Sequence, residues 1–547
     1  MKIDLLLAAS AIALASFSSS AVAEQMNMPG MTMPRTPKKA PSKKADLKKT
    51  PATKAKTKKS AAKKPVHRKT ALAKAAPMHE AGAAKGGSMP TAHGGMPMPA
   101  GPQGQSGSTT SMSMNQSQMQ HGTMQMPSNS QTGGAMSMPM GQAPTGPTAM
   151  DQMSTGHGAH GMSKAGALGS YAAQRESSGT AWQPDASMGM SGPMLMSRDW
   201  MLMAHGTLNL VYDHQSGPRG GDKAFASGML MAMARHQLGN GTIQFRAMLS
   251  PDPLMGPAGY PLLLATGETA NGTTPLVDRQ HPHDLFMELS ASVSQNIGSK
   301  SSVFVYGGLP GEPAFGPPAF MHRESILDSP EAPITHHWLD STHITFGVVT
   351  AGIVLDRIKL EASRFNAREP DQHRWNIETG PLDSTSVRLA WNPTRTLALQ
   401  GSWGYFKEPE QLEPDVNQTR WSASALWADD IAPGWHTAAT LAWGRKSSHG
   451  HNDDAIGAEG SIKHADWTVF GRGERTENRE LLGLVDGPAY KVGKLSIGAL
   501  RDFPIADHFS IGAGGLVSVN FVPDAIAPFY NGRNPIGAMG FLRLKLN

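Results

Sequence analysis

From about Arg198 to the end of the chain, apolar and polar residues alternate with a period of two. Between Phe509 and Phe521 the odd positions carry mainly Ile, Ala and Val, whereas the even positions carry mainly Ser, Gly and Asn. Between Trp435 and Gly444 one face carries Trp, Thr, Ala, Leu and Trp, and in both segments aromatic residues close the apolar stripe. Successive side chains of a β-strand point to opposite faces, so the pattern predicts strands with one apolar face.

The same periodicity predicts sixteen strands, near 198–213, 224–238, 240–252, 284–296, 299–309, 342–352, 354–367, 383–392, 395–406, 418–430, 434–446, 453–463, 465–475, 487–500, 506–520 and 536–546. Short turns alternate with long loops at 253–283, 310–341, 368–382 and 522–535. A soluble sandwich would also alternate, but its inner faces should be more aliphatic than these Gly, Ser and Thr faces. The fold class predicted for 198–547 is all-β, an outer-membrane antiparallel β-barrel of about 16 strands, in contact with lipid and with both termini in the periplasm.

The first residues predict export. An apolar run from Leu5 to Phe17 is too short to span a bilayer, and Ala21-Val22-Ala23 has the small-x-small pattern that signal peptidase cuts. We therefore interpret 1–23 as a signal peptide, which agrees with location in the bacterial outer membrane. The chain has no cysteine, so neither a lipid anchor on cysteine nor a disulfide is possible.

Residues 24–197 have a different composition, rich in Pro, Gly, Ser, Gln, Met and Lys, and predict a disordered tail in the periplasm. Within it, residues 35–74 hold 14 Lys, two Arg and one acid, Asp46. That block carries +15, so the remainder of the +6 chain carries −9, and we do not expect nucleic-acid binding. The block suits cell-wall or lipopolysaccharide anions, and a solvated, self-repelling spacer is the alternative interpretation.

Methionine supplies the first candidate chemistry, because 23 of the 34 methionines lie between Met26 and Met196, where the sequence predicts no core for them to fill. Thioether sulfur is a soft, uncharged ligand that suits Cu(I) or Ag(I). An oxidant sink is the alternative role. The candidate ligands form Met-x-Met groups: Met26, Met28, Met31, Met33, Met96, Met98, Met112, Met114, Met124, Met126, Met136, Met138, Met140, Met188, Met190, Met194 and Met196. By contrast, Met201, Met203, Met229, Met231 and Met233 alternate within predicted strands, and we interpret them as ordinary wall residues.

Histidine supplies the second candidate chemistry, because 15 of the 21 histidines lie in the barrel half. Several fall in predicted long loops, and neutral imidazole binds Cu(II), Zn(II) and Ni(II) well. If these loops fold inward, they predict a site for a divalent metal; the alternative is that the histidines only hydrogen-bond loop carbonyls. The candidate ligands are His281, His283, Asp284, His336 and His337, with His322, Glu324, Asp340 and His343 near them in sequence.

The Met-x-Met tail joined to a C-terminal barrel resembles the outer-membrane copper resistance proteins of the CopB type. The resemblance implies copper binding, sequestration or export in metal resistance, and it implies a periplasmic multicopper oxidase as a partner. We found no motif for a catalytic nucleophile, a helical zinc-protease site or a phosphate-binding loop, so we predict no enzyme, no catalytic residues and no organic cofactor. The alternative function is a passive diffusion pore tethered to the cell wall by its basic tail.

Overall fold

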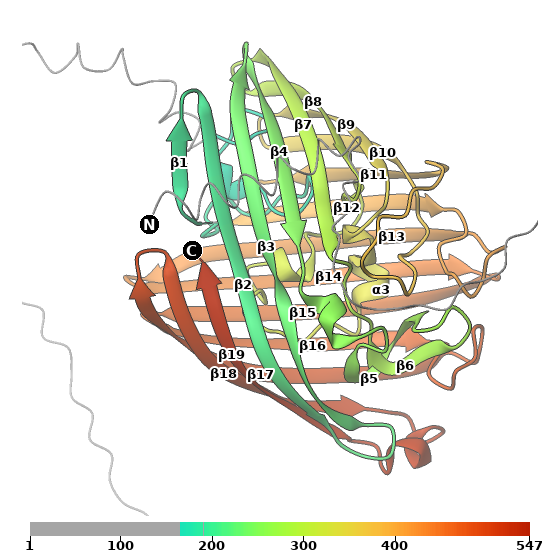
Figure 1. The fold of residues 1–547 in the computed structure, drawn as a ribbon. Helices are drawn as coiled ribbons and strands as arrows, with labels where there is room; N and C mark the ends of the chain where they lie inside the picture. Colours follow the sequence, from blue (N-terminus) through green and yellow to red (C-terminus); the bar gives the residue numbers. More distant parts are fainter. Residues whose placement is uncertain (1–164, 190, 547) are drawn as a thin grey trace, which may run out of the picture. The chain divides into compact units, whose positions relative to one another are not determined.

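The computed structural model of the protein describes residues 165–189 and 191–546, and Figure 1 shows their fold. The predicted signal peptide, the Lys-rich block and the tail up to residue 164 lie outside the described residues. None of the described helices has the length and hydrophobicity needed to cross a lipid bilayer. The main sheet contains β2 (Trp200–Gln215), β3 (Gly221–Leu238), β4 (Gly241–Leu249), β7 (Phe286–Gly298), β8 (Ser301–Gly308), β9 (Val348–Leu355), β10 (Ile358–Phe365), β11 (Ser384–Trp391), β12 (Leu397–Phe406), β13 (Gln418–Ala432), β14 (Trp435–Ser448), β15 (His451–His464), β16 (Trp467–Asn478), β17 (Tyr490–Ala506), β18 (Phe509–Phe521) and β19 (Ile536–Leu546).

These sixteen strands pair antiparallel with their neighbours in chain order, and β19 pairs with β2, which closes the sheet into a barrel. The predicted fold class and all sixteen predicted strands are confirmed. The largest shift of a strand start concerns β9, predicted at 342–352 and found at Val348–Leu355, because residues 341–343 form the 3-10 helix η5 (Ser341–His343) instead. A short strand, β1 (Met194–Ser197), also pairs with β2.

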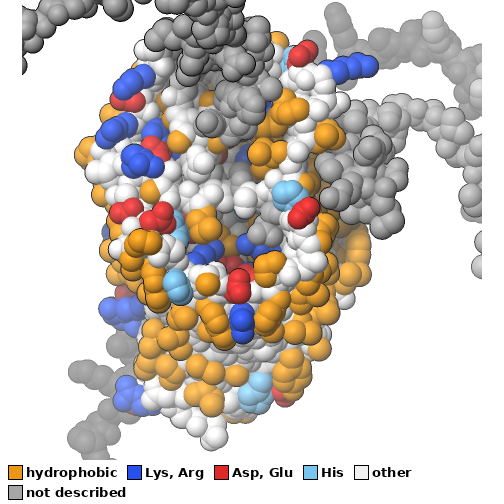
Figure 2. All heavy atoms as spheres, turned by 90° about the vertical axis from the view of Figure 1, so that its left-hand side faces the viewer, with side chains coloured by type: hydrophobic (Ala, Val, Ile, Leu, Met, Phe, Trp, Pro, Cys, Tyr) orange, Lys and Arg blue, Asp and Glu red, His pale blue; other side chains and the backbone are white. Residues whose placement is uncertain are grey.

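Alternation along each strand separates a polar interior from an apolar exterior. In β10, Leu360 points outward and is 49% exposed, whereas its neighbours Lys359 and Glu361 point inward and are almost fully buried. Figure 2 shows hydrophobic side chains over much of the outer surface. A soluble barrel would have the opposite arrangement, so the exterior is matched to lipid.

Aromatic side chains lie near both edges of this apolar exterior. Trp435 and Trp467 begin β14 and β16 at one end of the barrel, while Trp421 and Phe521 lie toward the other end, on β13 and β18. All four are more than two-fifths exposed. Aromatic girdles of this kind mark the two membrane interfaces of outer-membrane barrels, so the predicted location in the outer membrane is supported by the outer wall itself.

The two ends of the barrel differ. Six of the seven connections at the end that holds Trp200 and Leu546 are two-residue turns, such as 239–240, 299–300 and 507–508, and the seventh, 392–396, has five residues. We call this the short-turn end. The opposite, long-loop end carries the connections 250–285, 309–347 and 366–383, and the first of these contains the separate hairpin of β5 (Tyr260–Thr269) and β6 (Pro275–Gln280).

The long loop 309–347 lies inside the barrel. Its residues form ion pairs with inward side chains around the wall: Arg323 with Glu459 of β15, Glu331 with Arg472 of β16 and Lys494 of β17, and Asp328 with Arg543 of β19. Glycines of the inner wall make room for it, because a Cβ at Gly444 would collide with the carbonyl oxygen of Trp338.

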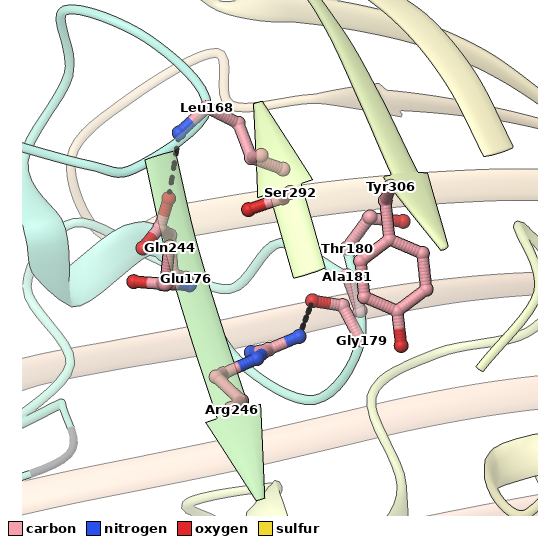
Figure 3. A pocket seen from close by; sticks show the side chains of 9 residues that line it. All are labelled: Leu168, Glu176, Gly179, Thr180, Ala181, Gln244, Arg246, Ser292 and Tyr306. Carbon is pink, nitrogen blue, oxygen red and sulfur yellow. Dashed lines mark hydrogen bonds between the residues drawn. The ribbon is translucent and has the colours of Figure 1, made fainter. Parts of the chain in front are cut away.

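The boundary predicted between tail and barrel needs a correction. Residues 165–187, assigned by the sequence to the disordered tail of 24–197, are folded against the inner wall, and we call them the lumen segment. Its carbonyl oxygens accept hydrogen bonds from Ser294 of β7 and Ser302 of β8, and Thr180 accepts one from Arg388 of β11. Figure 3 shows another contact of the lumen segment with the wall, in which Arg246 of β4 donates a hydrogen bond to the Gly179 carbonyl oxygen. The ordered part therefore begins at least 33 residues before the predicted start of the barrel.

The lumen segment escapes prediction from sequence because it has little regular structure. Only the 3-10 helix η2 (Ala173–Arg175) is formed within it. Contacts to side chains far away in the sequence hold it in place, both polar, such as the ion pair of Glu176 with Arg235, and apolar, in the cluster of Leu168, Tyr171 and Trp182 with Phe304. Neither periodicity nor apolar content signals such contacts.

Candidate metal centre

Five buried histidines meet inside the long-loop half of the barrel, and we call them the histidine cluster: His281, His283, His336, His337 and His343. The first two follow β6, the next two begin helix α3 (His336–Leu339), and the last ends η5. The ring centroids of His283 and His343 are 5.1 Å apart, and those of His336 and His343 are 5.2 Å apart. The long loops thus bring four predicted ligands together and add His343.

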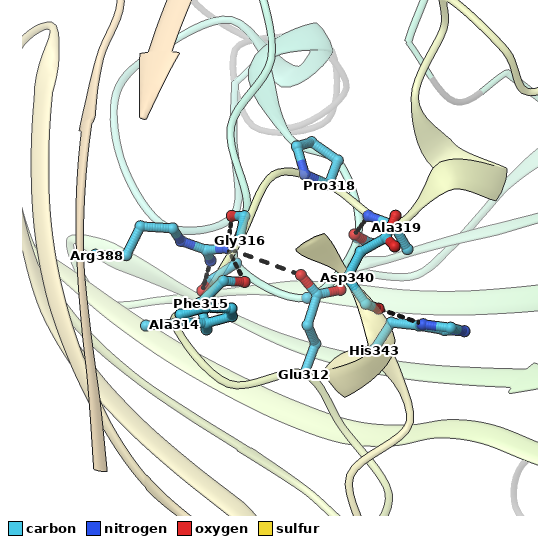
Figure 4. Close-up of polar contacts among 12 residues, drawn as sticks. Glu312, Ala314, Phe315, Gly316, Pro318, Ala319, Asp340, His343 and Arg388 are labelled. Atoms are coloured by element: carbon cyan, nitrogen blue, oxygen red, sulfur yellow. Dashed lines mark hydrogen bonds and ion pairs between the residues drawn. The ribbon is translucent and has the colours of Figure 1, made fainter. Parts of the chain in front are cut away.

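Acceptor groups orient three of these rings through Nδ1. The Nδ1 atom of His283 lies 2.8 Å from Asp252, and that of His336 lies 2.8 Å from Asp340. His343 donates from Nδ1 to the Asp340 carbonyl oxygen at 2.7 Å, a contact drawn in Figure 4. A carbonyl oxygen can only accept, so the proton of His343 is on Nδ1 and the lone pair is on Nε2. Metal-binding histidines are usually oriented in this way.

The Nε2 atoms on the other side of the rings are the unusual feature. Those of His283, His337 and His343 are buried and have no hydrogen-bond partner among the described residues. Buried polar atoms are normally paired, because leaving one unpaired costs about 1–3 kcal/mol. Three such nitrogen atoms in one cluster make it a candidate site for a ligand that accepts nitrogen donors.

His337 also belongs to a compact group with two acids. Its Nδ1 lies 3.2 Å from Glu369, and ligand atoms of His337, Glu369 and Glu410 all lie within 4.8 Å of one another. Gly267 lets the ring fit, because a Cβ there would collide with it. Among the described residues this is the set of three whose spacing suits a single ion.

Sequence reasoning missed Glu369 and Glu410. They lie in the loops 366–383 and 407–417, separated from His337 by more than thirty and seventy residues. The only signal was their place in loops at the same end of the barrel as the histidines. Convergence of three loops on one point depends on tertiary contacts, which the sequence does not display.

Asp284 is buried but faces a different partner. It forms an ion pair with Arg374 at 3.2 Å, and Arg374 also pairs with Glu268, which lies 3.1 Å from Nε2 of His281. Burial raises the pKa of Asp284 to about 6, although Arg374 opposes the shift. Asp284 is thus linked to the cluster through Arg374 and Glu268, and its Oδ1 is buried without a hydrogen-bond partner among the described residues. Its role as a metal ligand stays a prediction.

The electrostatics keep the rings neutral. Burial lowers the pKa of His281, His336, His337 and His343 below the usual 6.5, and the shifts of His281 and His343 are the largest. Burial and the charge of Glu410 raise the pKa of Glu369 well above its usual range. Lys446 and Arg420 outweigh burial at Glu410 and lower its pKa to about 2. The site therefore offers imidazole nitrogen atoms beside two carboxyl groups whose pKa values are shifted in opposite directions.

We expect the metal-free protein to lose stability as the pH falls below about 6.5, because unfolded histidines bind protons there while the buried ones do not. The unfolded state then holds more protons than the folded state, so the free energy of unfolding rises with pH across this window. The measurement is the urea midpoint in detergent between pH 5 and 7.5. His343→Gln should flatten this dependence; an unchanged slope would contradict the assignment.

Only part of the predicted methionine set can be located. Met188, Met194 and Met196 are exposed, and the last two lie on β1, paired with Met203 and Met201 of β2. Met190 and the predicted ligands from Met26 to Met140 lie outside the described residues. Their role in binding Cu(I) stays a prediction.

No protein-family model matches the chain, and no curated protein matches it. Among solved structures, the outer-membrane OmpT of Vibrio cholerae is 8% identical, covers 64% of this chain and 100% of its own, and gives a TM-score of 0.37. Salmonella typhi OmpF in complex with daunomycin is 12% identical, with coverages of 64% and 100% and a TM-score of 0.41. An anion-selective porin from Comamonas acidovorans is 10% identical, with coverages of 63% and 100% and a TM-score of 0.37. All three scores are below 0.5, so the description of the barrel rests on its own strand pairing, and the resemblance to CopB-type proteins stays a prediction.

Proposed function

We propose that this outer-membrane barrel handles copper, with a divalent-ion site at the histidine cluster and Cu(I) capture on its methionine-rich tail. The observation that carries the proposal is the set of buried, unpartnered Nε2 atoms on His283, His337 and His343. In the proposed orientation the long loops face outward and the tail lies in the periplasm, as in bacterial outer-membrane barrels generally.

The spacing of the rings supports a metal at this position. Two imidazoles bound to one tetrahedral ion at ~2.0–2.1 Å have ring centroids roughly 5 Å apart. The His283–His343 and His336–His343 separations of 5.1 and 5.2 Å are close to that value. The triad of His337, Glu369 and Glu410 supplies a second binding position that shares His337 with the histidine cluster.

The two donor sets of the chain favour copper over other ions. Imidazole with carboxylate suits Cu(II), Zn(II) or Ni(II), whereas thioether suits Cu(I) or Ag(I). Copper is the element that both sets accept, in its two oxidation states. Binding, sequestration and export in copper resistance are all compatible with this chemistry, and a periplasmic multicopper oxidase is a proposed partner.

A passive diffusion pore is the less favoured alternative. An open pore requires a water-filled lumen, whereas here loop 309–347 and the lumen segment both bond to inward side chains of the wall. The interior is polar, as in porins, but much of its polarity is used in these contacts. We therefore favour selective handling of an ion over general diffusion of solutes.

The direct test is Zn(II) and Cu(II) titration of the purified full-length protein, followed by calorimetry and metal analysis. We expect His337→Gln and His343→Gln each to remove or weaken by at least about tenfold one high-affinity equivalent. His451→Asn, which alters an exposed histidine of β15, is the matched control and should leave it unchanged. Equal binding by all four proteins would exclude the cluster as a metal site.

The tail makes a separate prediction. Deleting residues 24–160 removes the methionine groups from Met26 to Met140 and keeps the lumen segment, so the barrel should still assemble. We expect the cells to lose copper tolerance because Cu(I) capture is lost, while Zn(II) binding at the histidine cluster persists. Growth on graded copper, with the barrel level measured by immunoblot, provides the check; unchanged tolerance would assign the tail to tethering alone.

A further inference from the structure

Methionine side chains also gather inside the barrel wall, beside the histidine cluster. We call this group the methionine cluster: Met229, Met231, Met248, Met287 and Met321. Met231, Met248 and Met287 are almost completely buried together with Ile344 and Phe346, and Met229 and Met321 pack against them from partly buried positions. The prediction that Met229 and Met231 are wall residues is correct in position, since both point inward from β3.

A histidine is in direct contact with this cluster. Nε2 of His205 lies 3.2 Å from the sulfur of Met231, and the two side chains are 8% and 0% exposed. They face each other across the pair of strands β2 and β3. This places an imidazole nitrogen and a thioether sulfur at a separation that one small ion could bridge.

A second histidine comes from loop 309–347. His322 follows Met321, is 7% exposed, and its Nε2 has no hydrogen-bond partner among the described residues. The residue before it, Met321, packs against the methionine cluster, so His322 lies next to the cluster in the chain. His322 therefore adds a buried imidazole nitrogen without a partner among the described residues.

The carboxylate next to Met287 in the chain is already paired. Arg246, two residues before Met248 on β4, forms an ion pair at 2.8 Å with Glu288, which follows Met287 on β7. The carboxylate is thereby occupied. The donors left to an ion are uncharged sulfur and nitrogen atoms.

We propose that His205, Met231 and His322, with sulfur from the neighbouring methionines, form a site for a soft monovalent ion, Cu(I) or Ag(I), inside the barrel. Soft thioether and neutral imidazole donors select such ions, whereas hard or divalent cations favour the carboxylate-containing group at His337. Apolar packing by Ile344 and Phe346 surrounds the site and limits access of water to the ion.

The methionine cluster and the histidine cluster border the same cavity. This cavity is lined by Met229, Met321, His281 and His283, among other residues. Soft and borderline donors therefore share one space inside the barrel. The site stands on its own donors and does not depend on the divalent-ion site of the histidine cluster.

The test is methyl NMR of the full-length protein in detergent micelles, labelled with ¹³C at the methionine methyl groups and titrated with Ag(I) nitrate. We expect the resonances of Met231 and at least one of Met229, Met248 and Met321 to shift. The shift should occur while the Ag(I) concentration is still below the total concentration of methionine residues. Met539, a buried methionine of β19, should not shift. The methionines of the tail, which we also expect to bind Ag(I), serve as an internal positive control.

Variants test whether the shifts of the methyl resonances come from coordination of Ag(I) by these side chains. His205→Phe and Met231→Leu should each weaken the apparent Ag(I) dissociation constant read from the remaining cluster methyls by at least tenfold, whereas Met539→Leu should leave it unchanged. A shift of tail methyls alone, or equal affinities in all variants, would overturn the proposal. Zn(II) binding by His337→Gln is measured separately, so failure here leaves the proposed function standing, and the reverse also holds.

Discussion

Replacing Arg323 with methionine is expected to lower the free energy of unfolding by about 3–5 kcal/mol, the largest effect of any single change predicted here. Arg323 is 1% exposed and holds the Glu459 carboxylate through two hydrogen bonds of 2.8 and 2.7 Å. It also pairs with Asp340. Methionine fills a similar volume, so the substitution mainly leaves two buried carboxylates without their cation.

The same change should disturb the histidine cluster. Burial would raise the pKa of Asp340, but Arg323 and the hydrogen bond from His336 outweigh it and lower that pKa. Without Arg323, Asp340 gains a proton more readily and becomes a poorer acceptor for Nδ1 of His336. Zn(II) affinity should therefore fall together with stability, although Arg323 touches no proposed ligand atom.

Urea unfolding followed by tryptophan fluorescence gives the stability, and Arg445→Met is the control. Arg445 forms an exposed pair with Asp454 at 2.8 Å, which should contribute less than about 1 kcal/mol. Adding Glu459→Met to Arg323→Met should recover part of the loss, because one buried charge is then removed. If Arg323→Met and Arg445→Met cost the same, the interior network does not stabilise the barrel.

The barrel was predictable because each wall strand repeats one physical pattern. In β18, Ile511, Val517 and Phe521 face lipid while Ser510, Ser518 and Asn520 face the interior, and this alternation is legible in the sequence alone. Where the chain leaves the sheet, the pattern ends. The 3-10 helix η5 replaces the predicted start of β9 because His343 is tied back to Asp340, a contact with no periodic signal.

The candidate site was predictable only in its loop histidines. His281, His283, His336 and His337 could be selected because imidazoles in inward-folding loops suggest a metal, whereas Glu369 and Glu410 resemble any surface acids in the sequence. The methionines of β3 could be placed on the wall, but the approach of His205 to Met231 depends on strand register. Sequence analysis therefore cannot predict a site whose side chains come from segments that are far apart in the chain.

Removing the lumen segment should raise the conductance of the barrel, although loop 309–347 stays inside it. A variant lacking residues 24–187 loses the chain that bonds to Ser294, Ser302 and Arg388 across the inner wall. Water should then fill the space, and we expect single-channel conductance in planar bilayers to rise several-fold. The variant lacking residues 24–160 keeps the lumen segment and should conduct as weakly as the intact protein.

Ion selectivity provides a second readout of the same deletion, because the lumen segment contains the Glu176 carboxylate. Glu176 pairs with Arg235 at 3.0 Å, whereas Arg246 keeps Glu288 and Lys359 keeps Glu361 within the wall. The deletion thus removes the Glu176 carboxylate from beside Arg235, and a net gain of positive charge along a water-filled passage favours anions. We expect the reversal potential in a KCl gradient to move toward that of chloride; equal conductance and selectivity in the two deletion variants would show that the segment does not obstruct the passage.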